Sequence, residues 1–265
     1  MILSPTSNSI DILGVKIHYY GLIIAFAIIV SLFLLKYLVK KSDKNLDFAI
    51  IYDISPFLIL VSILSARVYY VLINWSFYSQ HLVDTFKLSQ GGLSIHGTLL
   101  GGLLFLVLFL KHKKVNILNY CDIFACVLPL GQAIGRLGNY FNQEAFGLPC
   151  NYPWCLYIAP EHRPLTYYNS QYFHPTFLYE LLLNLIIFLI LNYIYLKFPK
   201  LKSGTILALY FILYSIVRIF VEFLRIDAQV FLVDLPLPIV VSLGLIVFNF
   251  IFLLYLYMKT SKFNF

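Results

Sequence analysis

The chain has 265 residues, of which 61% are hydrophobic and only 12% are charged, and its net charge is +7. A soluble globular protein carries roughly 25% charged residues and about 45–50% apolar ones. The shortage of charge excludes a protein whose whole surface faces water, so we predict a polytopic membrane protein embedded in a lipid bilayer. Lysines beside an anionic cytoplasmic leaflet account for the positive charge, and no nucleic-acid partner is expected.

Seven apolar stretches predict an all-α protein with seven transmembrane helices. A helix needs about 20 mostly apolar residues to cross a bilayer, and the Leu, Ile and Phe runs do not alternate as β-barrel strands do. Asp53 and Arg67 interrupt the second stretch and Asp122 interrupts the fourth, which leaves the ends of these two open. The predicted spans are 20–38, 48–73, 93–110, 116–135, 181–196, 204–222 and 236–258.

Lysines predict the orientation of these helices. They follow the first, third, fifth and seventh spans, as Lys40, Lys113, Lys200 and Lys262 illustrate, and Lys87 is the exception among the other connections. The positive-inside rule therefore places the N-terminus outside and the C-terminus in the cytoplasm. The start of the chain lacks the features of a cleaved signal peptide, so the first span is expected to remain. We expect one membrane-embedded domain over residues 1–265, with an outside loop at about 139–175.

The four cysteines divide into two pairs. Cys121 and Cys126 lie in or beside the fourth span and are expected to be small core residues. Cys150 and Cys155 lie in the outside loop, where oxidation is possible, and we favour isolated thiols over a disulfide. No metal-ligand pattern accompanies them, and no metal or organic cofactor is predicted.

The segment 91–102, at the start of the third span, contains His96 between glycines. Gly97 and Gly101 have the small-xxx-small spacing that lets membrane helices pack closely. His96 is either a packing residue or a neutral imidazole that accepts a proton. Arg67, in the second span, either faces the same cavity as the other polar groups or pairs with Asp53.

The segment 135–147, at the outer end of the fourth span, is rich in amide and guanidinium groups. If it is helical, Arg136, Asn139 and Gln143 lie within roughly 60° of one another, and Asn142 and Glu144 add further hydrogen-bonding groups. Such donors suit a phosphate and hydroxyl groups, because an arginine can bind two phosphate oxygens at once. The alternative is a capped helix end followed by a solvated loop.

Two later segments add polar groups near the outer surface. Residues 173–180 place Pro175 near the start of the fifth helix, which is a common position for proline. In the sixth span, Tyr214, Arg218, Glu222 and Arg225 fall within an arc of about 80° on one helix face. A polar ribbon on an apolar helix must face a protein-lined or wet cavity. It is either an anion-binding stripe or a structural ladder of ion pairs.

Together these segments resemble the bacterial phosphatidylglycerol–prolipoprotein diacylglyceryl transferase family. The matching blocks follow in family order from residue 20 to about 227. They are Tyr20-Gly21-Leu22, Ser65-Ala66-Arg67-Val68-Tyr69-Tyr70, Gly91 to Gly97, Gly135 to Glu144 with Gly147, His174 to Glu180, and Tyr214 with Arg218 to Arg225.

The resemblance implies a seven-helix enzyme of the bacterial inner (plasma) membrane with two substrates. These are phosphatidylglycerol and a prolipoprotein whose signal peptide presents a lipobox cysteine. The family transfers the diacylglyceryl group to that sulfur as a thioether and releases glycerol phosphate, which is the first step of lipoprotein maturation. By similarity, the expected catalytic residues are His96, Arg136, Arg218 and Tyr20. The expected substrate-binding residues are Arg136, Asn139, Glu144, Gly147, Tyr214, Glu222 and Arg225.

The sequence departs from the family pattern at three places. Thr98 replaces a glycine usually found after the histidine, which narrows the space beside His96. Ile226 replaces a usual proline, and the last span lacks the usual glycine-glutamine entry. The last two departures leave the docking of the final helix open.

The chemistry can be argued independently of the family. A cysteine thiol, with a pKa of about 8.5, must become a thiolate before it attacks carbon. His96 is the candidate base, and a hydrogen-bond donor to the phosphate is the alternative role. Arg136 and Arg218 would stabilise the departing phosphate monoester where water is sparse. Asn139 and Glu144 would orient glycerol hydroxyls, while Glu222 fixes an arginine.

The sequence is less typical of two other classes of protein than of a transferase. An anion transporter or lipid flippase would line a passage with the same arginines, and inverted repeats would favour it. We find no repeat, and the polar groups gather toward one side of the membrane. A structural membrane scaffold would not need His96 together with several buried arginines.

Overall fold

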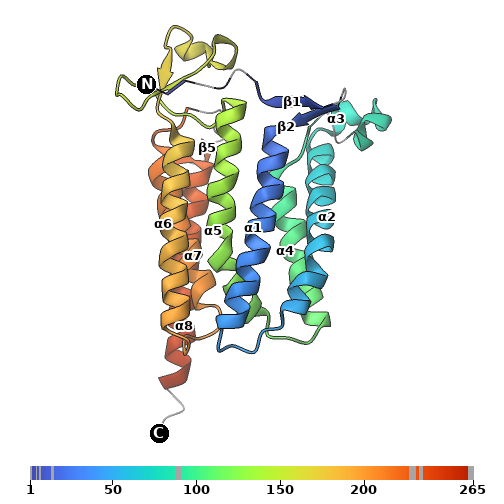
Figure 1. The fold of residues 1–265 in the computed structure, drawn as a ribbon, viewed down its shortest axis with the longest axis vertical. Helices are drawn as coiled ribbons and strands as arrows, with labels where there is room; N and C mark the ends of the chain where they lie inside the picture. Colours follow the sequence, from blue (N-terminus) through green and yellow to red (C-terminus); the bar gives the residue numbers. More distant parts are fainter. Residues whose placement is uncertain are drawn as a thin grey trace. The chain divides into compact units, whose positions relative to one another are not determined.

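Within the residues that the structure describes, seven helices are long and apolar enough to cross a membrane, as expected for a multi-pass membrane protein. The computed structural model describes residues 2–3, 5, 7–12, 15–87, 91–226, 231–232 and 235–261 (Figure 1). The seven helices are α1 (Tyr19–Lys41), α2 (Phe48–Ile73), α4 (Ile95–His112), α5 (Ile117–Asn142), α6 (Thr176–Lys197), α7 (Thr205–Glu222) and α8 (Leu237–Ser261). The all-α prediction with seven spans is confirmed.

Shorter elements connect these helices. A helical turn, α3 (Trp75–Tyr78), and a 3-10 turn, η1 (Leu82–Phe86), follow α2, and two further 3-10 turns are η3 (Pro160–His162) and η4 (Leu165–Tyr167). Three antiparallel two-stranded ribbons are β1 (Ser9–Ile12) with β2 (Val15–His18), β3 (Leu156–Tyr157) with β4 (Tyr172–Phe173), and β5 (Phe231–Leu232) with β6 (Leu235–Pro236).

Helices α5 and α6 extend furthest beyond their predicted ends. Helix α5 continues to Asn142 rather than stopping near residue 135, so the amide-rich segment is mostly helical. Helix α6 begins at Thr176, directly after Pro175, rather than at residue 181. Proline lacks the N–H that a helix interior needs, so it suits a helix start. The predicted spans stopped at Arg136 and Glu180 because both residues are charged, although both lie inside these helices.

The chain divides into two compact units, which we describe separately. The larger unit comprises Met1–Lys44 and Cys121–Phe265, and the smaller unit comprises Asn45–Tyr120. The single domain expected from the sequence stays a prediction.

In the larger unit, α1 packs against a glycine face of α5. A Cβ atom on Gly138 would lie 2.2 Å from the Tyr20 ring, and one on Gly135 would lie 3.6 Å from Ile24. Any larger residue at Gly138 would therefore push Tyr20 away from α5.

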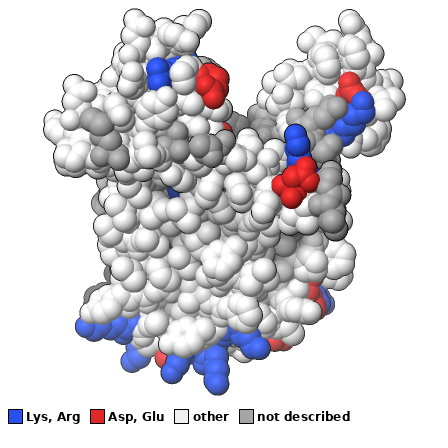
Figure 2. Space-filling view, turned by 45° about the horizontal axis from the view of Figure 1, so that its top comes forward, with Lys and Arg blue, Asp and Glu red and all other residues white. Residues whose placement is uncertain are grey.

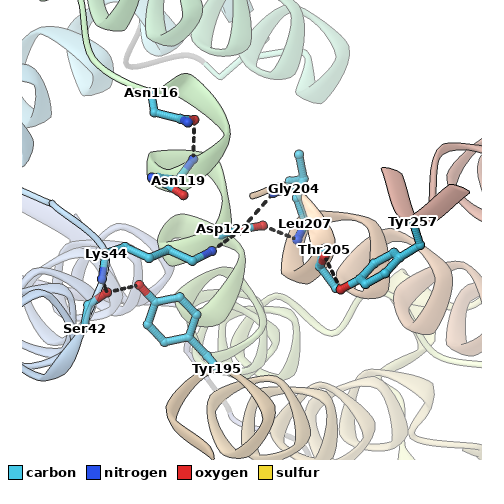
Figure 3. A network of polar contacts seen from close by, with 10 residues as sticks. All are labelled: Ser42, Lys44, Asn116, Asn119, Asp122, Tyr195, Gly204, Thr205, Leu207 and Tyr257. Carbon is cyan, nitrogen blue, oxygen red and sulfur yellow. Dashed lines mark hydrogen bonds and ion pairs between the residues drawn. The ribbon is translucent and has the colours of Figure 1, made fainter. Parts of the chain in front are cut away.

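The N-terminus of α7 is capped by a carboxylate from α5. Gly204 precedes the helix with a φ of 94° and has no side chain to cap it. Asp122 supplies the cap: its carboxylate accepts hydrogen bonds from Gly204 N (2.9 Å) and Leu207 N (3.0 Å), and Lys44 Nζ lies 2.8 Å away (Figure 3). Asp122 is fully buried. A negative charge is favourable at a helix N-terminus, so this contact locks α5 to α7.

Basic residues gather at the same end of the larger unit. Helix α1 ends in Lys40 and Lys41, α6 ends in Lys197, and Lys202 lies over the Tyr257 ring of α8 at 4.7 Å. Figure 2 shows blue side chains along one edge of the visible face, below a broad white surface. Lys262 lies outside the described residues, and the orientation of the termini stays a prediction.

In the smaller unit, glycines bring α2 and α4 together. A Cβ atom on Gly97 would lie 2.4 Å from the Ser65 carbonyl oxygen, and one on Gly101 would lie 2.0 Å from Ser65 Oγ. The packing role predicted for these glycines is confirmed. Asp53 pairs with Lys113 at 3.3 Å, so the alternative pairing of Asp53 with Arg67 is wrong.

The loop between α5 and α6 has its own small core. Phe146, Leu156 and Phe173 are buried in it, where β3 pairs with β4. Cys150 and Cys155 form a disulfide in this loop, so the expectation of isolated thiols is wrong. The close spacing of the cysteines and the fold of the loop bring the two sulfurs together. Cys121 and Cys126 are buried free thiols, as predicted.

Candidate functional site

Helices α5 and α7 and the segment after α7 bring three arginines of the larger unit to one buried carboxylate on α6. Arg136 of α5 forms an ion pair with Glu180 of α6. Arg218 of α7 lies 3.5 Å from Glu180 Oε1 and 2.5 Å from Glu222 Oε2. Arg225, which follows α7, lies 3.2 Å from Glu180 Oε1. We call Arg136, Glu180, Arg218, Glu222 and Arg225 the arginine cluster.

The arginine cluster lies close to the ends of its helices, with buried carboxylates and partly buried arginines. Arg136, Glu180 and Arg218 each lie roughly 6–9 Å from the nearest end of their helix, at about 1.5 Å per residue. The two carboxylates are 2% exposed, whereas the arginine side chains are 13–21% exposed. Buried charges must be paired. The three arginines and two glutamates leave one net positive charge, which suits the binding of an anion.

The backbone after α5 holds this arrangement in register. The Ala145 carbonyl accepts hydrogen bonds from Thr176 Oγ1 (2.6 Å) and Phe177 N (3.1 Å) at the start of α6. Gln143 and Ala145 both adopt positive φ values, which are uncommon outside glycine. The sharp turn ties the end of α5 to the start of α6, and it thereby sets Arg136 beside Glu180.

The amide groups after Arg136 form a second polar group beside the cluster. Arg136 Nη1 lies 3.5 Å from Asn139 Oδ1, and Asn139 Nδ2 donates to Glu144 Oε1 at 2.9 Å. Asn142 donates to the same oxygen at 3.2 Å. These contacts connect Arg136, Asn139 and Glu144, which were predicted to act together.

Gln143 does not join this group, contrary to the helical spacing argument. The helix ends at Asn142, and Gln143 turns away because its φ is 50°. Its side chain donates to the Pro5 carbonyl at 3.1 Å and accepts from Ala159 N at 2.8 Å. Gln143 therefore connects the loop between α5 and α6 to the N-terminal segment.

The backbone around Arg225 is not helical, contrary to the prediction. Helix α7 ends at Glu222, so Arg225 does not continue the polar ribbon of the helix. It forms an isolated antiparallel bridge with Gly147, and Leu148 N donates to the Leu224 carbonyl at 2.8 Å. A Cβ atom on Gly147 would lie 2.5 Å from that carbonyl oxygen. Gly147 thus permits the close approach that positions Arg225, and its predicted substrate-binding role stays a prediction.

Two tyrosines from the predicted set lie in the larger unit. Tyr20, at the start of α1, packs its ring against Gly138 of α5 and is 39% exposed. Tyr214 lies one turn before Arg218 on α7, and its ring stacks on Tyr210 with centroids 5.8 Å apart. The catalytic role of Tyr20 and the binding role of Tyr214 stay predictions.

A layer of side chains with buried polar atoms lies about one helical turn further along these helices than the cluster. Gln132 precedes Arg136 on α5, Asn184 follows Glu180 on α6, and Ser215 precedes Arg218 on α7. Gln132 Oε1, both amide atoms of Asn184 and Ser215 Oγ have no hydrogen-bond partner within the described part of the chain. Buried polar groups in proteins are normally hydrogen-bonded, so this layer can take up water or polar groups of a bound molecule.

His96 and Arg67 belong to the smaller unit. His96 lies in the first turn of α4, and its ring stacks on Tyr69 with centroids 5.9 Å apart. The predicted meeting of His96 with Arg136 and Arg218 in one cavity stays a prediction.

Arg67 binds a loop of its own unit. Its guanidinium donates to the carbonyls of Asp84 (2.6 Å), Thr85 (2.9 Å) and Gly91 (2.7 Å). The Lys87 ammonium lies 2.6 Å from Asp84 and lowers the pKa of that carboxyl. Arg67 therefore ties α2 to Asp84 and Thr85 on one side and to Gly91, shortly before α4, on the other.

Glu180 is the cluster residue that the sequence interpretation did not select. The sequence pattern of residues 173–180 predicts a helix start, although Glu180 lies within an apolar run. An ionisable residue inside a membrane span is a sign of function, and this was the available signal. Among the described residues, no group of three or more His, Cys, Asp or Glu side chains is placed to hold a metal ion.

Comparison with known proteins gives matches along most of the chain. A family model described as prolipoprotein diacylglyceryl transferase matches residues 8–255. The chain is 44% identical over 230 residues to the phosphatidylglycerol–prolipoprotein diacylglyceryl transferase of Acaryochloris marina. This alignment covers 85% of this chain and 81% of that protein. The chain is 41% identical over 260 residues to the protein of that name from a Nostoc species, covering 97% and 91%. A Synechocystis protein of the same name is 41% identical over 259 residues, covering 96% and 90%.

Proposed function

Because the chain belongs to the prolipoprotein diacylglyceryl transferase family, we propose that it transfers the diacylglyceryl group of phosphatidylglycerol to a lipobox cysteine of a prolipoprotein signal peptide. The products are a thioether-linked lipoprotein precursor and glycerol phosphate. This reaction is the first step of lipoprotein maturation.

The proposal places the protein in the inner (plasma) membrane of a bacterium. The N-terminus lies outside, the C-terminus lies in the cytoplasm, and residues 1–265 act as one membrane-embedded domain without a nucleic-acid partner. The lysines at the end of the larger unit that carries Lys40, Lys41 and Lys197 support this orientation. The arginine cluster then lies near the outer surface, where the cysteine of a prolipoprotein arrives.

The arginine cluster is the observation that carries the proposal. Phosphatidylglycerol offers a phosphodiester anion, and guanidinium groups bind phosphate oxygens in pairs. Arg136 and Arg218 are held side by side through Glu180, and Glu222 fixes Arg218 at 2.5 Å. Donors that are fixed in advance stabilise charge that develops on a leaving group. The cluster is therefore suited to a phosphate that departs.

The transfer is a displacement at a saturated carbon. The cysteine sulfur forms a bond to the glyceryl carbon, the carbon–oxygen bond to phosphate breaks, and the electron pair stays on the phosphate oxygen. The thiol proton leaves before or during attack. In the proposal His96 takes that proton; where His96 instead donates a hydrogen bond to the phosphate, the thiol proton passes to water. The bonds balance without a metal or an organic cofactor.

The remaining predicted residues bind or orient the substrates. Asn139 and Glu144 are linked at 2.9 Å and would hold glycerol hydroxyls. Tyr214 and Arg225 would border the phosphate site. Tyr20 packs against Gly138 of α5 and would bound the site on the side of α1.

The test supplies labelled phosphatidylglycerol and a synthetic lipobox peptide to the purified protein in detergent or vesicles. We expect the label on the peptide in a bond that resists thioester cleavage, together with free glycerol phosphate. A peptide with serine in place of the lipobox cysteine is the matched control. Movement of label across vesicles without a new carbon–sulfur bond would refute the transferase and favour a lipid transporter.

A further inference from the structure

Glu180 has a position that a phosphate clamp alone does not explain. Its carboxylate contacts Arg136, Arg218 and Arg225, the same guanidinium groups that would bind a phosphate. An anionic residue among anion-binding groups weakens the attraction of the site for its ligand. Each guanidinium has five N–H donors, so it can bind Glu180 and a phosphate together.

The charge on the phosphate changes during the reaction proposed above, on which this inference rests. The phosphodiester of phosphatidylglycerol carries a single negative charge. When the carbon–oxygen bond breaks, its electron pair stays on the phosphate, and a monoester carries about −1.5 to −2 at pH 7. A strongly positive site would hold this product more tightly than the substrate.

The arginine cluster has a charge that matches the substrate. Three arginines and two glutamates give a net charge of +1, and without Glu180 the same groups would carry +2. We propose that Glu180 is a positioning residue that holds the three arginines together and limits their charge, so that the site binds the diester without retaining the monoester product.

The substitution Glu180→Gln tests the charge, because glutamine keeps the shape and one acceptor oxygen. We expect glycerol phosphate to bind the variant about tenfold more tightly than the wild type, because one opposing charge near the phosphate is gone. Isothermal titration calorimetry at pH 8 and fixed ionic strength measures this without turnover. In kinetic experiments on Glu180→Gln, a burst of thioether product should precede slow steady-state turnover, because the release of glycerol phosphate becomes rate-limiting.

Two control variants separate the charge of Glu180 from the length of its side chain and from the net charge of the whole protein. Glu180→Asp keeps the charge with a shorter reach, and it should leave the affinity for glycerol phosphate close to that of the wild type. Glu161→Gln removes an exposed carboxylate in η3 and should leave both ligand affinity and turnover unchanged. A purely structural Glu180 predicts the opposite sign for Glu180→Gln: misplaced arginines would bind glycerol phosphate more weakly.

If Glu180→Gln does not fold, the binding of two ligands to the wild type tests the inference instead. Glycerophosphoglycerol is a diester with one negative charge, and it should bind the wild type at least as tightly as glycerol phosphate despite its lower charge. Tighter binding of the monoester by the wild type would overturn the inference, as would unchanged or weaker monoester binding by folded Glu180→Gln. A wild type that binds both ligands in the expected order but makes no thioether would refute the proposed function and leave the role of Glu180 standing.

Discussion

Removing the charge of Asp122 should destabilise the protein strongly. Asp122→Asn keeps the shape of the side chain but leaves the Lys44 ammonium, 2.8 Å away and 12% exposed, without its partner. The Asp122 carboxylate accepts hydrogen bonds from Gly204 N and Leu207 N with one oxygen each. An asparagine amide has a single acceptor oxygen for the two N–H groups. Breaking a buried pair by removing one partner costs about 3–5 kcal/mol.

The chain offers a matched control for this substitution. Asp53 and Lys113 form a second aspartate–lysine pair at 3.3 Å, but their side chains are 52% and 38% exposed. Exposed pairs contribute about 0.2–1 kcal/mol. At about 2–4 °C per kcal/mol, Asp122→Asn should lower Tm by about 6–20 °C, and Asp53→Asn by less than about 4 °C.

Thermal unfolding of the detergent-solubilised protein, followed by intrinsic fluorescence, gives both shifts. Adding Lys44→Met to Asp122→Asn should recover part of the loss, because it removes the unpaired ammonium. Equal shifts for Asp122→Asn and Asp53→Asn would refute the assignment of Asp122 as the cap of α7.

Three further predictions concern activity. Arg136→Lys and Arg218→Lys should each lower the rate of transfer by about 10²–10³-fold, because lysine cannot bind two phosphate oxygens side by side. The initial rate with phosphatidylglycerol measures this loss. Full turnover in both variants would remove the phosphate-binding role. His96→Asn should abolish transfer to a peptide thiol at neutral pH if His96 takes the proton, and an unchanged rate would rule that role out. Gly147→Ala places a Cβ atom 2.5 Å from the Leu224 carbonyl oxygen, so we expect a loss of about 1–3 kcal/mol in unfolding free energy with an increased KM for phosphatidylglycerol. A variant with wild-type stability and KM would show that this close contact does not matter.

The sequence was sufficient for features that depend on neighbouring residues. The length and apolarity that a bilayer demands act on each segment separately, so the seven spans could be found from local windows. The periodicity of α7 placed Arg218 and Glu222 on one face, and the structure pairs them at 2.5 Å. The spacing of Gly97 and Gly101 likewise predicted a closely packed helix face, and the structure supplies its partner, α2.

The tertiary structure decided which groups meet when their segments are distant in the chain. Arg136, Arg218 and Arg225 converge on Glu180, and no spacing within one segment specifies this choice of carboxylate. Arg225 reaches the cluster only because a bridge to Gly147 holds the chain after α7 has ended. A hydrophobic pattern determines where each helix lies along the sequence, whereas the pairing of buried charges depends on packing between helices, because a buried charge must find a partner wherever the fold places one.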